Sequence, residues 1–294
     1  MNFARKYNDY LEIVGKRGVI IRLGPMHLTI IAERNGVPLI DEARKGARIA
    51  VRLLEDVAKH KRILKKNVFE ITSENRFPRV IRESIKACRL TCDESLTPMA
   101  AIPGAIADIV ADAIREMGAT KVVVDNGGDI AIRLEGCESV KVGIAPRAKI
   151  CTHVIEATTS NGIGGIATSG LGGMGFTKGV ASAATTIAEK ASLADASSTV
   201  IGNSTFCEEI EVIKCPANVL DPDSDIGNQA VTLKVGKISK LSAIRAISNG
   251  LKVARRLMNT GMIKGAVVFV GEKVGMVPSG IARRLDHRSM FILC

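Results

Sequence analysis

The sequence predicts an α+β fold in which mostly antiparallel sheets pack against helices. Long segments with apolar residues at every third or fourth position alternate with short β-branched runs. Several of these runs are joined by turns of a few residues, which suit antiparallel pairs and are too short for parallel crossovers. Hydrophobic residues make up 46% of the chain, but aromatic residues only 3%, so the core is expected to be aliphatic.

The N-terminal third begins with a strand pair and continues into helices. VIIRLG (18–23) and LTIIAE (28–33) read as strands joined by a turn at Gly24 and Pro25. From residue 41 to 59 the apolar spacing predicts a helix with acidic residues at its start and Lys59 at its end, which suits the helix dipole. Pro78 opens a second helical stretch.

The rest of the chain continues the alternation of helices and strands. The expected elements are a helix at 103–118, strands at 121–125, 129–135 and 139–145, a Gly-rich stretch at 152–179, a strand running into a helix over 180–202, an irregular segment at 203–240 with a DPDSD turn, a helix at 243–261 and a strand at 264–272. No internal repeat or linker is visible, so residues 1–294 are expected to form one domain. Its parts are a basic N-terminal portion (about 1–95), a motif-bearing portion (96–205) and a C-terminal helix-strand portion (206–294).

The positive charge is concentrated near the N-terminus. The formal net charge is +11, and residues 1–90 hold 20 Lys and Arg against 10 Asp and Glu, most densely in KHKRILKK (59–66). Such a surface is either a solvated helix face or a site for an anion, an acidic protein partner or a phosphorylated ligand. Nucleic acid is disfavoured because no aromatic residues interleave with the basic ones.

Neither an apolar run of membrane-spanning length nor a signal-peptide pattern is visible, so we expect a cytoplasmic protein without a membrane partner. Both a monomer and a homo-oligomer remain open.

The seven cysteines include Cys88 and Cys92, one helical turn apart, a spacing that matches neither a zinc knuckle nor a C-x-x-C pair. They are either reduced, partly buried thiols or a sulfur-handling pair.

Asp195 and Thr199 are candidate metal ligands. On a helix, residues four apart project from the same face. A carboxylate and a hydroxyl are hard oxygen ligands of the kind that Mg²⁺ prefers, with water and phosphate oxygens completing its shell. The alternative is that Asp195 caps the start of a helix.

Two Gly-rich turns are candidates for close contact with a ligand. Asn126, Gly127 and Gly128 form a hairpin-turn signal, and Thr168, Ser169 and Gly170 lie within a longer Gly-rich run. Backbone N–H groups in such turns can bind anions. The run lacks the Lys-Ser/Thr of a Walker A loop and the strand-turn-helix context of a dinucleotide fold.

Four motifs, in this order, resemble those of the ApbE-like superfamily, best known as FAD:protein FMN transferases, over residues 97–205. They are IPGAIAD (102–108), GGDI (127–130), TSG (168–170) and ADASST (194–199). SLTPMAAIPG (95–104) is similar to a hallmark of an uncharacterised cytoplasmic branch of that superfamily.

The resemblance implies an ApbE-like (T-fold-like) architecture and a site for FAD or FMN with Mg²⁺. The metal ligands it implies are the side chains of Asp195 and Thr199 and the carbonyl of Ala100. The metal would grip the FAD pyrophosphate while FMN passes to a Thr or Ser of a partner protein. The implied cofactor-binding residues are Gly104, Asp108, Gly127, Gly128, Asp129, Thr168, Ser169 and Gly170.

The chain departs from the superfamily pattern at residues implied in catalysis. Pro103 stands where the pattern has a lysine, and neither H-x-I-D-P-x-T-G nor the N-terminal G-G-x-F-D is present. We therefore expect binding of a flavin or another phosphorylated ligand with a divalent cation, and we assign no catalytic residue. The alternative is a non-catalytic or partner-dependent protein in sulfur or cofactor metabolism.

Overall fold

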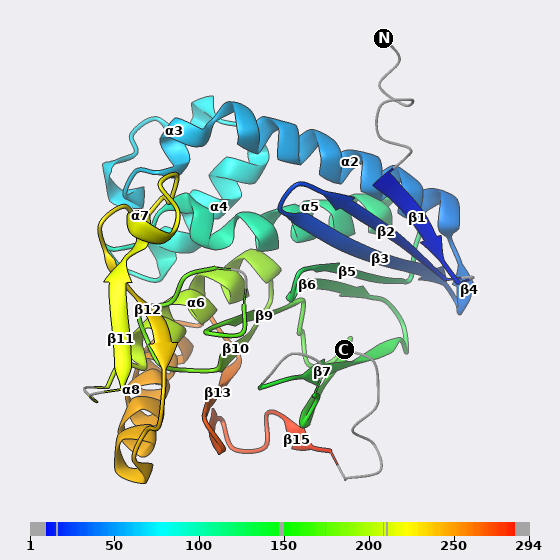
Figure 1. Cartoon of the computed structure of the whole chain (residues 1–294). Helices are drawn as coiled ribbons and strands as arrows, with labels where there is room; N and C mark the ends of the chain where they lie inside the picture. The colour runs from blue at the N-terminus through cyan, green and yellow to red at the C-terminus, as the bar shows by residue number, and fades with distance from the viewer. Residues whose placement is uncertain are drawn as a thin grey trace.

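A ten-stranded antiparallel sheet forms the centre of the described structure (Figure 1). The computed structural model describes residues 10–15, 17–146, 150–173, 175–207, 209 and 211–285. The strands run in the order β1-β2-β3-β5-β6-β9-β10-β13-β14, and β4 pairs with the C-terminal end of β3. Every pairing is antiparallel. The predicted α+β class with mostly antiparallel sheets is therefore confirmed.

The strands of this sheet are short and rich in Val, Ile and Ala. They are β1 (Leu11–Val14), β2 (Gly18–Leu23), β3 (Met26–Arg34), β4 (Val37–Pro38), β5 (Lys121–Asn126), β6 (Asp129–Leu134), β9 (Gly165–Ser169), β10 (Ala183–Ala188), β13 (Gly265–Val270) and β14 (Lys273–Val277). The expected hairpin turns at residues 24–25 and 127–128 are present between β2 and β3 and between β5 and β6.

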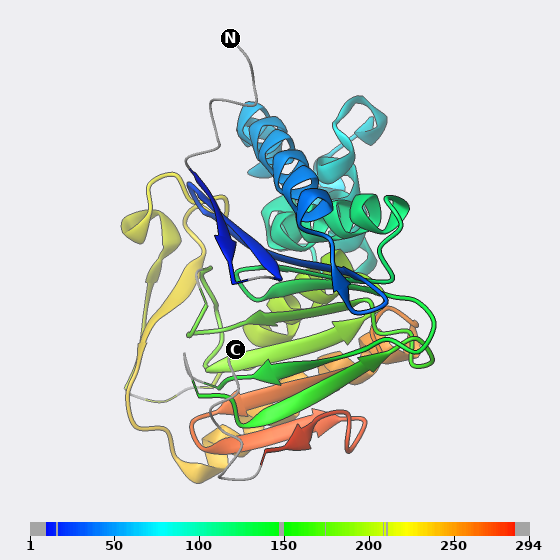
Figure 2. The ribbon, with the colours of Figure 1, turned by 90° about the vertical axis from the view of Figure 1, so that its right-hand side faces the viewer.

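The longer helices pack on one face of the sheet (Figures 1 and 2). They are α2 (Ile40–Lys59), α4 (Arg79–Leu90), α5 (Ile102–Glu116), α6 (Ala191–Ser204) and α8 (Lys240–Asn259); α3 (Lys61–Leu64), α7 (Ala217–Leu220) and the 3₁₀ turn η4 (Pro98–Ala101) are short. α2 and α5 cover the N-terminal strands, whereas α6 and α8 cover the strands from β9 to β13. The two aliphatic cores meet along the contact between α5 and α6.

The opposite face of the sheet is covered in part by a second, three-stranded sheet. β7 (Ser139–Ile144), β8 (His153–Thr158) and β15 (Arg283–Arg284) pair in the order β15-β8-β7. Val142 and Ile155 of the small sheet share a buried cluster with Ile166 and Ile187 of the large one. Alternate residues of β10 thus enter different cores, since Ala184 and Ala188 pack toward α6 and α8.

The expectation that residues 203–240 are irregular was wrong, because they contain a hairpin of β11 (Val212–Pro216) and β12 (Ala230–Val235). The Gly-rich stretch at 152–179, for which no element was predicted, contains β8 and β9. In both segments the strands are held by pairing with partners distant in sequence or across a long loop, which local glycine and polar content does not reveal.

The crossing of α5 and α6 requires a residue without a side chain. A Cβ atom on Gly104 would lie 2.5 Å from the carbonyl oxygen of Ala191 and 2.8 Å from the nitrogen of Ser192. Both are backbone atoms at the start of α6 and cannot rotate away. Gly104 therefore sets how closely the two helices approach.

We predict that Gly104→Ala lowers the free energy of unfolding by about 1–3 kcal/mol, because the added methyl group forces the helices apart. Urea denaturation would measure the change. The matched control is Gly46→Ala in α2, where a Cβ would lie 2.5 Å from the terminal methyl group of Ile114, a side-chain atom that can shift by rotation, and not from backbone. Equal losses in the two variants would contradict a backbone-limited crossing.

Candidate functional site

A cleft of about 340 Å³ opens where η4, the β5–β6 turn, the end of β9 and α6 meet. Eight of the residues implicated by the sequence line it: Ala100, Gly127, Asp129, Thr168, Ser169, Gly170, Asp195 and Thr199. These residues come from four segments spread over a hundred positions of the chain. The fold thus brings the candidate metal ligands and the two Gly-rich turns to one cavity.

Three of the sequence-implicated residues lie outside the cleft lining: Gly104, Asp108 and Gly128. Gly104 lies at the helix crossing, where its N–H donates to a carboxylate oxygen of Asp195 at 2.9 Å. Gly128 has φ +104° and donates its N–H to the side chain of Asp125 at 2.8 Å, so it shapes the β5–β6 turn.

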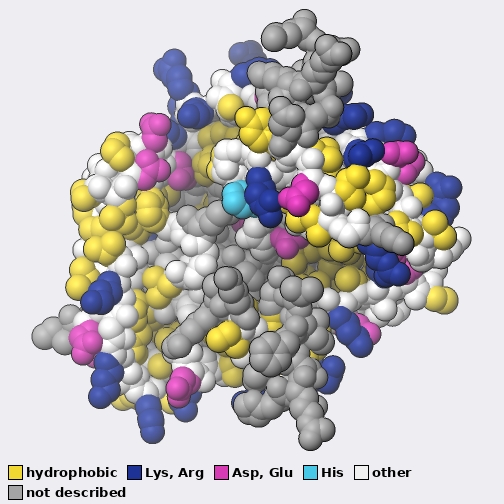
Figure 3. All heavy atoms as spheres, turned by 45° about the vertical axis from the view of Figure 1, so that its right-hand side comes forward, with side chains coloured by type: hydrophobic (Ala, Val, Ile, Leu, Met, Phe, Trp, Pro, Cys, Tyr) yellow, Lys and Arg dark blue, Asp and Glu magenta, His cyan; other side chains and the backbone are white. Residues whose placement is uncertain are grey.

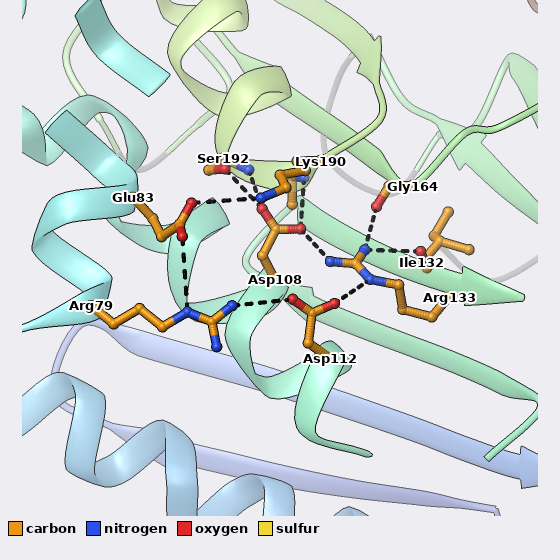
Figure 4. A network of polar contacts seen from close by, with 10 residues as sticks. Arg79, Glu83, Asp108, Asp112, Ile132, Arg133, Gly164, Lys190 and Ser192 are labelled. Carbon is orange, nitrogen blue, oxygen red and sulfur yellow. Dashed lines mark hydrogen bonds and ion pairs between the residues drawn. The ribbon is translucent and has the colours of Figure 1, made fainter. Parts of the chain in front are cut away.

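Asp108 is buried and fixes the start of α6 (Figure 4). Its carboxylate accepts hydrogen bonds from the N–H groups of Ala191 and Ser192 at 3.0 and 2.9 Å, and from Ser192 Oγ at 2.8 Å. It also pairs with Arg133 at 3.0 Å, whose guanidinium reaches Asp112 at 2.7 Å. A carboxylate at a helix N-terminus satisfies otherwise unpaired N–H groups, so the contacts of Asp108 are those of a helix cap supplied by another helix.

The turns at the cleft are held open by backbone conformations that favour glycine. Gly127 has φ +70° and Gly170 has φ +138°, and a Cβ on Gly170 would lie 2.8 Å from the carbonyl oxygen of Ala181. Asn126 ties the first turn to the start of α5, because its side-chain amide donates to the carbonyl of Pro103 at 3.2 Å. Both turns are therefore fixed in place, and at Gly127 and Gly170 no side chain separates their backbone from the cavity.

Two acidic side chains share the cleft without a basic partner. Neither Asp129 nor Asp195 has an ion-pair partner within 4.0 Å among the described residues. Burial raises the pKa of Asp195 to about 8, and nearby Asp108 adds to the shift, while the Gly104 N–H opposes it. Burial also raises the pKa of Asp129, with Asp195 and Asp125 contributing repulsion. Two buried carboxylates that repel each other are stabilised when one of them binds a proton or when a cation binds near them.

The oxygen donors at this end of the cleft suit a hard divalent cation. Asp195 offers a carboxylate, the partly buried Thr199 offers a hydroxyl one helical turn away, and Ala100 of η4 lines the same cavity. Mg²⁺ needs few protein carboxylates, because water and phosphate oxygens complete its shell. In the described part of the chain no group of three or more His, Cys, Asp or Glu side chains forms a metal cluster. The residues present therefore fit a metal that is shared with a phosphorylated ligand.

The fold adds residues to the cleft that the sequence did not indicate. Lys178, Asn203 and Asp225 line it, the last from the loop between α7 and β12. Thr97 Oγ1 donates a hydrogen bond to Asp225, which ties that loop to the wall formed by η4. No local motif marks these residues, and their positions follow only from the packing of distant segments.

The basic N-terminal tract (59–66) lies at the end of α2 and on α3, and none of its residues lines the cleft. Two of its lysines form ion pairs, Lys59 with Asp56 at 3.5 Å and Lys65 with Asp223 at 3.1 Å. On the face drawn in Figure 3, Lys and Arg side chains lie mainly around the edge. An acidic partner for this tract stays a prediction.

Cys88 and Cys92 differ sharply in their surroundings. Cys88 is fully buried, its thiol lies 3.4 Å from the carbonyl oxygen of Thr97, and burial raises its pKa. Cys92 is exposed and has φ +55°. The two thiols therefore do not present a shared reactive face.

The chain resembles proteins of one family. The model of a family described as "AbpE bacteria" matches residues 13–277. The UPF0280 protein of Methanothrix thermoacetophila is 39% identical over 132 residues, which are 44% of this chain and 54% of that protein. The UPF0280 protein of Methanosarcina acetivorans is 29% identical over 244 residues, covering 81% and 78% of the two chains. The chain spans about half the length of the first two such relatives it matches.

Two solved structures share a similar arrangement at 13% sequence identity. A mutant of the flavin transferase ApbE from Vibrio cholerae has a TM-score of 0.49, with 90% of this chain and 97% of that chain covered. The apo flavinyl transferase ApbE from Pseudomonas stutzeri has a TM-score of 0.48, with 90% and 96% covered.

None of the described helices is long and apolar enough to cross a membrane.

We predict that native-state alkylation modifies Cys92 and leaves Cys88 unmodified, because the buried thiol is both inaccessible and protonated at neutral pH. Peptide mass mapping after brief treatment with iodoacetamide would show the difference. Denatured protein is the control, in which both thiols react. Equal labelling of both in the native state would contradict the burial of Cys88.

We predict that Asp195→Asn flattens the dependence of stability on pH between about 4 and 8. The pKa of Asp195 is raised from 3.8 to about 8 by burial, so its contribution is most favourable at low pH and is lost as the pH rises. The asparagine keeps an oxygen for the Gly104 N–H but does not ionise. Urea denaturation in EDTA at several pH values would compare the two proteins.

The matched control for this measurement is Asp41→Asn, an exposed carboxylate in the first turn of α2. It shows the effect of losing one carboxylate outside the cleft. A profile for Asp195→Asn that runs parallel to that of the wild type would contradict the raised pKa of Asp195.

Proposed function

This chain belongs to the family described as "AbpE bacteria", and from that premise we propose that its cleft binds a flavin or another phosphorylated ligand together with a divalent cation. One observation carries the proposal. Asp195, Thr199 and Ala100 line the same cavity as the bare turns at Gly127 and Gly170. A carboxylate, a hydroxyl and glycine backbone that a ligand can approach closely, all in one cavity, are complementary to a phosphate bridged by a metal ion.

Asp195, Thr199 and the carbonyl of Ala100 would hold the cation, which supplies positive charge to the phosphate oxygens when bound. Gly104 keeps one carboxylate oxygen of Asp195 in place through its N–H. This leaves the second oxygen for the cation. Because the buried carboxylate binds a proton below about pH 8, cation binding at neutral pH would release that proton.

The cleft also offers apolar surface to a ring. Met26, Leu54, Ile106 and Phe176 contribute to its lining, and most of the lining surface is apolar. A ligand with a flat aromatic group and a phosphate chain matches a cavity that combines apolar lining with a few polar and charged groups.

The proposal does not extend to FMN transfer. Pro103 stands at the start of α5, where the superfamily pattern has a lysine, and it presents a carbonyl that Asn126 uses as an acceptor. No histidine lines the cleft among the described residues. The residues present support binding and charge neutralisation, and they offer no general base of the type implied by the resemblance.

We predict that the purified protein quenches the fluorescence of FAD or FMN in a saturable manner that depends on Mg²⁺. Asp195→Ala and Thr199→Val should each weaken this binding at least about tenfold, because each removes one oxygen ligand of the cation, and tenfold corresponds to about 1.4 kcal/mol. Fluorescence titration with and without EDTA would measure the affinity.

The control is Asp41→Ala, which removes an exposed carboxylate outside the cleft. Circular dichroism would establish that each variant is folded. Failure of the wild type to bind either flavin at high micromolar concentration, with or without Mg²⁺, would refute the flavin proposal. Binding that Asp195→Ala leaves unchanged would refute the assigned cation site.

A further inference from the structure

Lys178 is the one basic side chain in the described lining of the cleft. The charged residues that line the cavity with it are Asp129, Asp195 and Asp225. No carboxylate lies within 4.0 Å of the Lys178 ammonium group among the described residues. Its ammonium group instead donates a hydrogen bond to the hydroxyl of Ser95 at 2.9 Å. The Ser95 hydroxyl in turn donates to the carboxylate of Asp93 at 2.7 Å. The cleft therefore has an acidic pair and a separate positive charge that is linked to a carboxylate only through Ser95.

The backbone around Lys178 is held by three neighbouring segments. Its N–H donates to Oδ1 of Asn203 near the end of α6 at 2.8 Å, and its carbonyl accepts from Nζ of Lys214 at 2.9 Å. The preceding carbonyl, of Thr177, accepts from the N–H of Thr232 in β12 at 2.8 Å. Lys178 is thus fixed in a position, although it belongs to the Gly-rich segment between β9 and β10.

The side chain of Lys178 is half-buried, which makes its charge costly. Burial lowers its pKa, and the nearby carboxylate of Asp93 opposes that shift. A partly desolvated ammonium group without an ion-pair partner gains more from an anion than a fully hydrated surface lysine does.

A second hollow of about 620 Å³ adjoins the cleft at this point. Ser95, Lys178 and Asn203 line both cavities, so Lys178 lies on their boundary. The second hollow is also lined by Lys252 and Arg256 of α8, against a single acidic residue, Asp93. Positive charge therefore increases from the acidic pair toward this hollow.

We propose that Lys178 binds a phosphate group of the ligand at the boundary between the cleft and the second hollow. This inference rests on the proposed function and deepens it. Asp195 and Lys178 line the same cavity, so a ligand with two linked phosphates would place one at the cation and the other at the Lys178 ammonium group. The superfamily pattern has a lysine where this chain has Pro103. Lys178 would supply a positive charge to the cleft from a different part of the chain.

The alternative role of Lys178 is structural, as a tie to the loop at Ser95. The two roles are separable. Lys178→Met removes the charge and nearly keeps the length of the side chain, and Lys178→Arg keeps the charge. Ser95→Ala keeps the lysine and removes the tie, together with the hydrogen bond from the Ser95 hydroxyl to Asp93. The matched control is Lys273→Met, an exposed lysine on β14 that lines neither cavity.

The test is calorimetric titration of each folded variant with inorganic pyrophosphate in saturating Mg²⁺. We expect Lys178→Met to weaken binding at least about tenfold, because a charge-assisted hydrogen bond is lost. Lys178→Arg should stay within about threefold of the wild type, and Ser95→Ala and Lys273→Met within about twofold.

Three results would overturn the inference: no pyrophosphate binding by the wild type, unchanged affinity in Lys178→Met, or an equal loss in Ser95→Ala. The flavin titration separates this failure from failure of the proposed function. A wild type that binds FAD with Mg²⁺ and loses that binding in Asp195→Ala keeps the proposed site even if Lys178 proves to have no part in it.

Discussion

The contact between the Asp108 carboxylate and the start of α6 is the constraint on which the site depends. Asp108 lies on α5, and by accepting the first N–H groups of α6 it fixes where that helix begins relative to α5. Asp195 lies four residues further along α6 and meets the N–H of Gly104, one turn before Asp108 on α5. The two helices are thus joined by reciprocal carboxylate-to-backbone contacts, and the second of these directs Asp195 toward the cleft.

The same arrangement explains why the cleft holds buried carboxyl groups that lack a positive partner. Asp108 is paired with Arg133 and with the first N–H groups of α6, so its carboxylate is fully hydrogen-bonded in the interior. Asp195 has no basic partner among the described residues, and burial, with a contribution from Asp108, raises its pKa although the Gly104 N–H opposes the shift. A fold optimised for stability alone would pair or remove these acids, and strongly shifted carboxyl groups in a cavity are typical of functional sites.

Much of the fold was accessible from local patterns, while the site was accessible only in part. The periodicity of 41–59 and 243–261 predicted α2 and α8, and the turn at 127–128 predicted the β5–β6 hairpin. The motif residues Asp195 and Thr199 were correctly expected on one helix. Asp108 belongs to the same motif as Gly104, but its spacing in sequence could not distinguish a ligand contact from a contact with the backbone of α6.

The sequence by itself determined the alternation of helices and strands, the aliphatic core and the identity of the candidate cation ligands, because these depend on side-chain chemistry and on periodicities of a few residues. Only the tertiary structure decided which of these residues share a cavity. Contacts between segments far apart in the chain decide three features of the site region. They form the β11–β12 hairpin, hold Asp225 against Thr97 at the start of η4, and place Lys178 between the cleft and the second hollow. Such contacts are set by packing and by pairing across the whole fold, and no local pattern encodes them.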